Sequence, residues 1–548
     1  MRRTNRKNGK DIWLLILFSV WGTLLIVRLI ELQVFQHNFF SKRKITQTRT
    51  IEKIIPRRGT IFDRNGLVLA ISVSSHSAFV RKELTREELK KVKEALHLTN
   101  YQVQKMVKRW REGKKFTWLK RKLSEEEYKK LKSLGIKKIE FLKEPKRVYP
   151  QGTLAAHVLG GVNIDNRGAA GIEFSLQKYI GGTPGEREIL LDALGYPIDI
   201  KTLKPMVPGK DIKLTLDAKI QHVVEEALKR RIREARAKRG AVVVLNTKGE
   251  ILAMSSYPFY DPNHYSETYA KNRGALRNFA LSLIYPPGST MKFIDMAIAF
   301  QLGKLRMNEK IFCENGKIRA GRKYIRDHVP FGILSVPEIL IHSSNVGAIK
   351  IVRRIPRNIF YQYLLNFGFG RKTGVELPGE TGGILRRPER WNSYSRDYIA
   401  IGQEIATSPL QMAAATLVIA NSGEWIQPHI TFKKPLRKKV LSEEVVIKVR
   451  KMMKDVVEMG TGIKANLGWI GSGGKTGTAE KIVHGKKIGY TPSFVGFIPY
   501  SHPQYVVTVV IDEPMGKYYG ADVAAPLFRE IGKYLLMNSN IYPAVVLQ

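Results

Sequence analysis

The stretch at residues 285–293, with the sequence YPPGSTMKF, constrains the fold more than any other part of the chain. Pro286, Pro287 and Gly288 cannot lie in the interior of a helix, so a helix can begin only at or after them. Apolar side chains then recur at helical spacing, at Met291, Ile294, Ala297, Ile298 and Leu302. We therefore expect Ser289 in the first turn of a helix.

Ser289 and Lys292 form a candidate pair of nucleophile and base. They are three residues apart, which places both side chains on one face of the predicted helix, with Cβ atoms about 5–6 Å apart. The N-terminus of a helix has free backbone N–H groups and the positive end of the helix dipole. Both features stabilise the oxyanion that forms when a serine hydroxyl attacks a carbonyl. An N-cap serine beside a surface lysine gives the same S-x-x-K pattern. Other parts of the chain must therefore decide whether the pair is catalytic or structural.

Composition narrows the classes of function. The 548 residues are enough for more than one domain, and 92 Lys and Arg against 48 Asp and Glu give a formal charge of +44. Such an excess favours a polyanionic neighbour, namely nucleic acid, anionic lipid or an anionic cell wall, but the sequence contains no recognisable nucleic-acid-binding motif. The single cysteine, Cys313, excludes a disulfide framework and a cysteine-ligated zinc site.

The N-terminal segment has the pattern of a membrane anchor. Residues 1–10 carry five basic side chains, and residues 12–34 are mostly apolar. About 20 apolar residues span a bilayer core. A secretory signal peptide has an apolar core of only about 7–15 residues, followed by a small-residue cleavage site. We therefore expect an uncleaved transmembrane helix over residues 11–34, a cytoplasmic tail over 1–10 and the remainder outside the cytoplasm. Nucleic acid is not an expected partner in that compartment.

The C-terminal part of the chain predicts an α+β domain. A helix and two strands open it, the Ser289 helix and a long helical insertion follow, and three strands and a helix close it. The expected helices are 218–238 and 522–537, and the expected strands are 241–245, 251–255, 473–483, 493–500 and 505–511. A five-stranded, largely antiparallel sheet between helices is the simplest assembly. Upstream, residues 82–140 are rich in Lys and Glu and predict two or three exposed helices.

Two further motifs carry chemistry. Ser343, Ser344 and Asn345 follow a helical run and could relay a proton and hold a substrate amide. Residues 473–480 have the sequence GGKTGTAE. Their glycines allow the backbone to approach a ligand closely, and they also bring one positive charge and two hydroxyls, which suits a substrate carboxylate. A phosphate loop is excluded because Trp469 occupies the place of its first glycine. A second K-T-G, at residues 372–374, is interpreted as a surface loop.

S-x-x-K, S-x-N and K-T-G in this order are the signature of penicillin-binding proteins and serine β-lactamases. The whole chain resembles a class B penicillin-binding protein, which has one anchor, a non-catalytic pedestal of the dimerisation type and a transpeptidase domain. Residues 58–66 (RGTIFDRNG) look like the family's R-G-x-I-x-D-R-x-G, and further pedestal motifs match at 149–150, 155–160 and 171–173. Resemblance to the division-specific branch (FtsI type) lies at residues 343–347, 367–370, 377–380 and 408–411. Residues 401–404 (IGQE) depart from the usual F-G-Q-G.

This resemblance implies the domain organisation and the site. The pedestal would cover residues 35–205 and the transpeptidase domain residues 206–548. Ser289 would be the nucleophile, Lys292 the base, Ser343 a proton relay and Asn345 a holder of the peptide. The substrate carboxylate would be bound by Lys475, Thr476, Gly477 and Thr478. We expect Lys292 to be buried, with its pKa lowered by desolvation and by the charge of Lys475.

The resemblance also implies substrate, partners and location. The substrate would be a peptidoglycan stem peptide ending in D-Ala-D-Ala on lipid II-derived glycan strands, crosslinked during septal wall synthesis, and β-lactams would acylate the serine. Implied partners are a polytopic glycosyltransferase (FtsW type) and divisome proteins. No metal or other cofactor is implied. The protein would be a single-pass protein of the inner (cytoplasmic) membrane, with a periplasmic or otherwise extracytoplasmic catalytic domain.

Four alternatives stay open at this point. The elongation branch usually has S-x-D or S-C-D at the second motif, where this chain has Asn345. A β-lactamase needs a deacylating base, and no E-x-x-L-N follows Asn345; residues 389–392 (ERWN) are only a partial echo. A carboxypeptidase would release D-Ala without crosslinking. A β-lactam sensor usually has more membrane spans.

Overall fold

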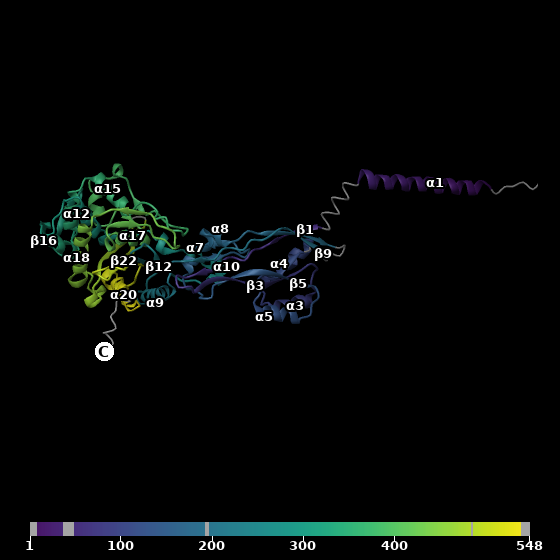
Figure 1. Cartoon of the computed structure of the whole chain (residues 1–548), viewed down its shortest axis with the longest axis horizontal. Coiled ribbons are helices and arrows are strands. Elements are labelled where there is room, and N and C mark those ends of the chain that lie inside the picture. Colours follow the sequence, from purple (N-terminus) through teal and green to yellow (C-terminus); the bar gives the residue numbers. More distant parts are fainter. Residues whose placement is uncertain (1–7, 37–48, 115, 192–196, 484–485, 539–548) are drawn as a thin grey trace, which may run out of the picture. The chain divides into compact units, whose positions relative to one another are not determined.

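A computed structural model describes residues 8–36, 49–114, 116–191, 197–483 and 486–538 (Figure 1). The chain divides into two compact units, one formed by residues 1–56 and 182–208 and the other by residues 57–181 and 209–548. Residues 1–7 of the expected cytoplasmic tail lie outside the described residues.

The first unit contains the apolar helix and a small sheet. Helix α1 (Asn8–Ile30) continues into a π-helical turn (Glu31–Phe35). Within the described residues, Ile12–Phe35 is the one helical stretch long and apolar enough to cross a membrane, and none of it is buried against protein. It fits the expected single-pass anchor. Strands β1 (Arg49–Ile54), β8 (Gly185–Leu191) and β9 (Pro197–Lys204) form an antiparallel sheet with β8 in the middle.

The second unit begins with a pedestal built on strand β3 (Val68–Val80). This strand pairs with β2 (Ile61–Phe62), β4 (Thr117–Lys120) and β5 (Ile139–Val148), and β10 (Ile212–Lys213) extends the sheet beside β2. Helices α3 (Arg86–Ala95), α4 (Asn100–Arg111) and α5 (Glu125–Ser133) each begin at a capping box. They confirm the helices expected there, and a core that includes Val92, Leu119 and Leu131 holds them together.

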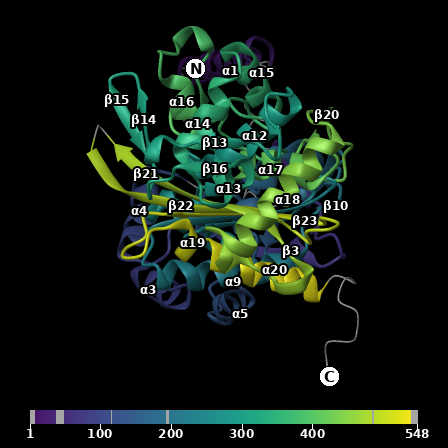
Figure 2. The ribbon, with the colours of Figure 1, turned by 90° about the vertical axis from the view of Figure 1, so that its left-hand side faces the viewer.

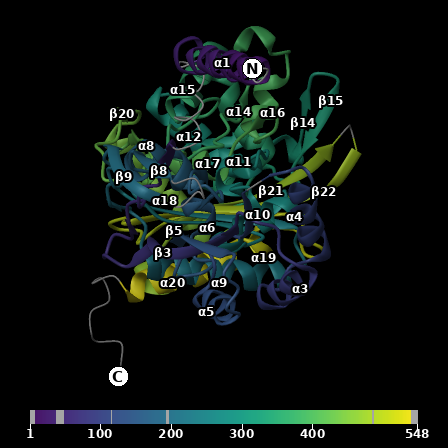
Figure 3. The same ribbon diagram turned by 90° about the vertical axis from the view of Figure 1, so that its right-hand side faces the viewer.

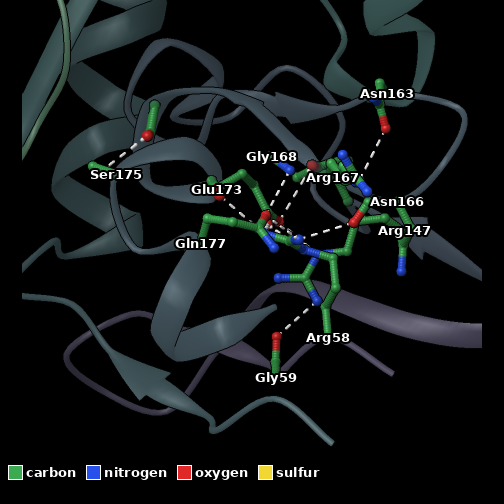
Figure 4. A network of polar contacts seen from close by, with 12 residues as sticks. Arg58, Gly59, Arg147, Asn163, Asn166, Arg167, Gly168, Glu173, Ser175 and Gln177 are labelled. Atoms are coloured by element: carbon green, nitrogen blue, oxygen red, sulfur yellow. Dashed lines mark hydrogen bonds and ion pairs between the residues drawn. The ribbon is translucent and has the colours of Figure 1, made fainter. Parts of the chain in front are cut away.

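A buried ion-pair cluster joins three distant segments of the pedestal (Figure 4). The carboxylate of Glu173 lies 2.5 Å from Arg58 Nη2 and 2.6 Å from Arg147 Nε, and all three side chains are fully buried. Arg147 also donates to the carbonyl of Gly59 at 2.8 Å. Glu173 is on helix α7 (Gly171–Ser175), whose neighbours are α6 (Ala156–Leu159), β6 (Gly161–Val162), β7 (Gly168–Ala170) and α8 (Gln177–Ile180).

The C-terminal part of the second unit is built on the five-stranded sheet that the sequence predicts. Its strand order is β12-β11-β23-β22-β21, and every neighbouring pair is antiparallel. The strands are β11 (Arg239–Asn246), β12 (Ile251–Tyr257), β21 (Gly473–Val483), β22 (Lys486–Ile498) and β23 (Tyr505–Asp512). Strand β22 begins earlier than expected, because its polar first residues pair with the end of β21 in a long hairpin.

Helices cover both faces of this sheet (Figures 2 and 3). Ala241, Val243 and Leu245 of β11 enter the larger core, whereas Val242 and Val244 enter the core on the other face. Helices α12 (Lys292–Gln301), α17 (Pro409–Ala420) and α18 (Glu443–Met459) contribute to the larger core. Helices α9 (Ala218–Glu234) and α20 (Ala525–Met537) contribute to the other.

Three helical details differ from expectation. Helix α9 ends at Glu234 rather than near 238. The closing helix is divided into α19 (Gly520–Val523) and α20, because Pro526 lies in the first turn of α20 and has no N–H to continue α19. Helix α12 is buried all round over residues 292–300, not only along the apolar face that its spacing predicts. It is a central helix of the domain, as is the fully buried α17.

Most of the remaining elements belong to the insertion between α12 and the last three strands. Two further short helices, α10 (Tyr265–Lys271) and α11 (Phe279–Ser282), precede α12. The elements of the insertion are β13 (Lys310–Phe312), β14 (Lys317–Ala320), β15 (Lys323–Arg326), β16 (Ile333–Ser335), α13 (Val336–Ile341), α14 (Asn345–Arg353), α15 (Arg357–Asn366), β17 (Ile384–Leu385), α16 (Ser395–Ala400), β18 (Ile405–Ala406), β19 (Glu424–Ile426) and β20 (Arg437–Lys439). The second K-T-G is in a loop outside the sheet, as predicted, although Thr373 is buried against Glu380.

Candidate active site

Ser289 lies in a single 3₁₀ turn, Gly288–Met291, that leads directly into helix α12. The turn requires a glycine before the serine because Gly288 has φ +58°, a conformation that other residues rarely adopt. The Gly288 N–H donates to the carbonyl of Gly402 at 3.1 Å, and the Thr290 hydroxyl donates to the carbonyl of Pro287 at 2.7 Å. These contacts fix the backbone on both sides of Ser289.

The amine of Lys292 is the centre of the site. Its Nζ lies 3.1 Å from Ser289 Oγ, 3.2 Å from Ser343 Oγ and 2.7 Å from Asn345 Oδ1. It also donates to the carbonyl of Ser343 at 2.5 Å. Lys292 has no exposed surface, so it is not a surface charge. The structure therefore brings Ser289, Lys292, Ser343 and Asn345 together, as the sequence predicts.

Burial lowers the pKa of Lys292 to about 7. The amine is therefore largely neutral and able to accept a proton just above neutral pH. The carboxyl groups of Asp327 and Asp295 act in the opposite direction, because a negative charge on either group would favour the protonated amine. We expected the charge of Lys475 to contribute to the lowering, and this expectation was wrong. Desolvation alone lowers the pKa, and the charge effect acts instead from Lys292 onto Lys475.

The second motif forms a strained turn at the start of helix α14. Ser343 is in the left-handed region with φ +61°, which is unusual for a residue with a side chain. Ser344 is fully buried, and its hydroxyl accepts the backbone N–H of Gly347 at 3.0 Å as the N-cap of the helix. The Asn345 side chain donates to the carbonyl of Arg326 at 2.7 Å, which turns its amide oxygen toward Lys292.

The third motif lies on β21, an edge strand of the sheet. Lys475 is fully buried, and its pKa is well below the usual value. Burial is the larger cause of this lowering, and the charge of Lys292 is the smaller one. Its Nζ lies 3.4 Å from the hydroxyls of Thr461 and Thr476, and the Thr476 hydroxyl donates to that of Thr461 at 3.0 Å. The Thr478 hydroxyl accepts the N–H of Gly520 at 2.9 Å.

Gly477 allows β21 to approach the nucleophile turn. A Cβ atom at this position would lie 2.5 Å from Ser493 Oγ and 2.8 Å from the carbonyl oxygen of Pro287. Both distances are too short for a carbon atom. The glycine of K-T-G is therefore needed so that the strand and the turn that carries Ser289 can pack together.

A cleft of about 1470 Å³ opens beside Ser289. Its lining includes Ser289, Asn345 and Thr478, together with His328, Tyr394, Tyr398, Glu404, Tyr490, Tyr518 and Tyr519. Glu404, the last residue of the unusual I-G-Q-E segment, has φ +56°, where a glycine would be unstrained. Its carboxylate forms an ion pair with Arg386. Among the described residues, no three His, Cys, Asp or Glu side chains form a group that could hold a metal ion.

Sequence reasoning missed three residues near the site. Thr461 comes from the loop after α18, and Asp327 from the loop after β15, and no sequence pattern connects either with the three motifs. Asp295 follows Lys292 by three residues, so helical spacing could have identified it. Asp295 is fully buried, burial raises its pKa well above the usual value, and within the described chain its carboxyl group has no hydrogen-bond partner.

Comparison with known proteins agrees with this geometry. Residues 240–533 match the family described as penicillin binding protein transpeptidase domain, and residues 53–214 match the penicillin-binding protein dimerisation domain. The probable peptidoglycan D,D-transpeptidase PenA of Neisseria meningitidis is 34% identical, over 97% of this chain and 93% of the relative. Stage V sporulation protein D of Bacillus subtilis is 33% identical, over 99% of this chain and 88% of that protein. Peptidoglycan D,D-transpeptidase FtsI of Escherichia coli is 30% identical, over 95% of this chain and 90% of that protein.

Among solved structures, penicillin binding protein 3 of Mycobacterium tuberculosis, in complex with aztreonam, has a TM-score of 0.70 and 26% identity and covers 91% of this chain and 100% of that chain. The chain therefore belongs to the class B penicillin-binding proteins and is a peptidoglycan D,D-transpeptidase, a serine acyltransferase. The family resemblance read from the three motifs is confirmed.

Proposed function

We propose that Ser289 is the acylated nucleophile of this transpeptidase and that neutral Lys292 is its general base. One observation carries the proposal: the buried Lys292 amine lies 3.1 Å from Ser289 Oγ and has a pKa of about 7. A base with this pKa is matched to a reaction near neutral pH. Ser343 and Asn345 contact the same amine, which supports a proton relay through Ser343 and a peptide-holding role for Asn345.

In the acylation step, Ser289 Oγ attacks the carbonyl carbon of the penultimate D-Ala while its proton passes to Lys292 Nζ. The backbone N–H groups of Ser289 and Thr478 stabilise the oxyanion, and one such donor contributes about 3–4 kcal/mol. The C–N bond then breaks, and the leaving D-Ala amine receives a proton from Lys292 through the Ser343 hydroxyl. An ester between Ser289 and the stem peptide remains.

In the transfer step, the amine of a second stem peptide attacks this ester. Its proton passes to the neutral Lys292, the C–O bond breaks, and the proton returns to Ser289 Oγ. The products are a new peptide crosslink and free enzyme. Tyrosine side chains line much of the cleft beside Ser289, and this cleft provides the space for a second strand.

Lys475, Thr476, Gly477 and Thr478 are the proposed binding site for the terminal carboxylate. Lys475 contacts only hydroxyl and carbonyl oxygens among the described residues, so a substrate carboxylate would supply its missing counter-charge. Binding of that anion would favour protonation of Lys475. Gly477 and the two threonines place backbone and hydroxyl groups beside the same position.

Labelled penicillin tests the assignment. The wild-type protein is expected to form a stable covalent adduct, with an acylation rate that rises as the pH increases through about 7, as Lys292 loses its proton. Ser289→Ala should form no adduct, and Ser133→Ala, at an exposed serine at the end of α5, serves as the control. Equal labelling of Ser289→Ala and wild type would refute the assignment. Rapid release of the label would instead favour a β-lactamase.

We further propose septal wall synthesis as the role of this enzyme, by analogy with relatives named FtsI. The proposed organisation is a cytoplasmic tail (1–10), an anchor in the inner (cytoplasmic) membrane (11–34), a pedestal (35–205) and an extracytoplasmic transpeptidase domain (206–548). The proposed protein partners are a glycosyltransferase of the FtsW type and divisome proteins. Depletion in the source organism tests the role: filaments with unpinched septa support division, and rounded cells support elongation.

A further inference from the structure

The carboxylate of Asp327 organises the turn of the second motif. Oδ2 accepts the hydroxyl of Ser344 at 2.7 Å, and Oδ1 accepts the backbone N–H of Val346 at 3.1 Å and that of Asn345. Asp327 is itself tied to its hairpin, because its N–H donates to the carbonyl of Gly316 at 2.9 Å. One partly buried side chain therefore joins the β14–β15 hairpin to the first turn of α14.

These contacts explain how Ser343 is held in a strained conformation. A left-handed backbone is unfavourable for a residue with a side chain, so neighbouring contacts must hold it. Asp327 fixes the next three residues: Ser344 through its hydroxyl, and Asn345 and Val346 through their N–H groups. With the turn held, the carbonyl and hydroxyl of Ser343 both reach Lys292 Nζ.

Asp327 is also one of three titratable groups around the Lys292 amine. Asp295 of α12 lies on the same helix, Lys475 faces it from β21, and Asp327 faces it from the loop after β15. Asp295 is buried without a hydrogen-bond donor in the described chain, which favours its neutral form. Asp327 accepts three hydrogen bonds, and its charge raises the pKa of the Lys292 amine.

On the basis of the proposed roles of Ser289 and Lys292, we propose that Asp327 is a positioning residue of the transpeptidation reaction. Its carboxylate holds the turn at residues 343–345 in the conformation in which three oxygen atoms converge on Lys292 Nζ. Its negative charge stabilises the ammonium form that Lys292 adopts after accepting the serine proton. Asp327 acts through the turn and through its field, and it does not contact the reacting atoms.

Two substitutions in the full chain separate these effects. Asp327→Asn keeps an oxygen toward the two N–H groups and removes the charge. Its acylation by labelled penicillin should fall less than about 10-fold at high pH, while the acid limb of the pH–rate profile moves about one pH unit lower, because the anion that raised the pKa of Lys292 is gone. Asp327→Ala also releases the turn, and its acylation should fall about 10–100-fold at every pH.

Asp217 provides the matched control. It is the N-cap of α9, where Oδ1 accepts the N–H groups of Lys219 and Ile220 at 3.0 and 3.2 Å, and it does not act on Lys292. Asp217→Asn and Asp217→Ala should keep the wild-type pH–rate profile. The proposal is overturned if Asp327→Asn keeps that profile too, if Asp327→Ala acylates at the wild-type rate, or if the Asp217 variants reproduce the changes.

The same experiment distinguishes failure of this inference from failure of the proposed function. A label that persists in Ser289→Ala contradicts the nucleophile itself. A label that is lost in Ser289→Ala, together with unchanged Asp327 variants, contradicts only the role of Asp327. Because Asp327→Asn keeps one oxygen that can accept the N–H groups of Asn345 and Val346, its profile remains informative even if Asp327→Ala does not fold.

Discussion

At the residue scale, the site depends on one amine that is buried without an anionic partner in direct contact. Lys292 donates to neutral oxygens of Ser289, Ser343 and Asn345. These contacts hold the amine in place but carry no negative charge that would stabilise its protonated form. A carboxylate in direct contact would raise the pKa of the amine and keep it protonated near neutral pH, so that it could not accept the serine proton. The arrangement sacrifices stability for reactivity, as is common at active sites.

Replacement of Lys292 by Met should show both consequences. Acylation by labelled penicillin is expected to fall about 10²–10⁴-fold, the usual range for loss of a general base. The folded-state pKa of about 7 is below the ordinary value of 10.5, so the unfolded chain binds more protons and the wild-type lysine destabilises the fold increasingly as pH falls from 10.5 through 7. Thermal unfolding should therefore show a larger benefit of Lys292→Met at pH 6 than at pH 9. A benefit that grows with pH would contradict this reasoning.

At the element scale, the catalytic groups are placed by close packing between the 3₁₀ turn that carries Ser289 and strand β21. The contact depends on Gly477, where any side chain would meet Ser493 and the carbonyl of Pro287. Backbone atoms on one side leave the strand little freedom to adapt. The close approach of the nucleophile turn to the carboxylate-binding residues therefore depends on this glycine.

Gly477→Ala should push β21 away from Ser289 and reduce acylation about 10–100-fold, because small displacements of reacting groups have large effects on rate. Gly489→Ala is the matched control on the neighbouring strand β22. A Cβ atom there would lie 3.4 Å from Glu513 Cγ, an ordinary contact. Stopped-flow acylation of both variants provides the measurement. Equal rates for Gly477→Ala and wild type would show that the strand tolerates the displacement.

At the scale of the whole molecule, the pedestal segments are joined to the catalytic segments by polar contacts within the second unit. The backbone N–H of Ala155 donates to Glu225 of α9 at 2.9 Å, and that of Tyr149 donates to Asn263 at 3.0 Å. Burial raises the pKa of Glu225 to about 7. The contact between these segments is therefore sensitive to pH in the neutral range.

Glu225→Gln should remove that sensitivity. The folded-state pKa exceeds the ordinary value of 4.5, so the wild-type contribution to stability is complete below about 4.5 and is lost as pH rises through 7. The loss amounts to about 3 kcal/mol at most. The melting temperature of the wild type should fall more between pH 5 and pH 8 than that of Glu225→Gln. Glu226→Gln, at an exposed neighbour, should behave as wild type. Parallel curves for all three proteins would contradict the prediction.

The sequence by itself determined the features that depend on local order along the chain. Pro286, Pro287 and Gly288 fix the start of the Ser289 helix, alternating and periodic apolar residues predict the five strands and their helices, and three short motifs identify the family. Each of these features depends on residues that are close together in the sequence, so each can be predicted from the sequence alone. The departure at Glu404 was also visible, although its left-handed backbone was not.

Only the tertiary structure decided which distant groups meet and how far each is removed from water. Ser343 lies 51 residues from Lys292 along the chain, and Asp327 comes from a loop that no motif marks. The pKa of Lys292 depends on complete burial, and α12 is buried on all sides only because the sheet and the insertion pack around it. Desolvation and long-range pairing are properties of packed elements, and for that reason spacing in the sequence could predict the catalytic pair but not the origin of its basicity.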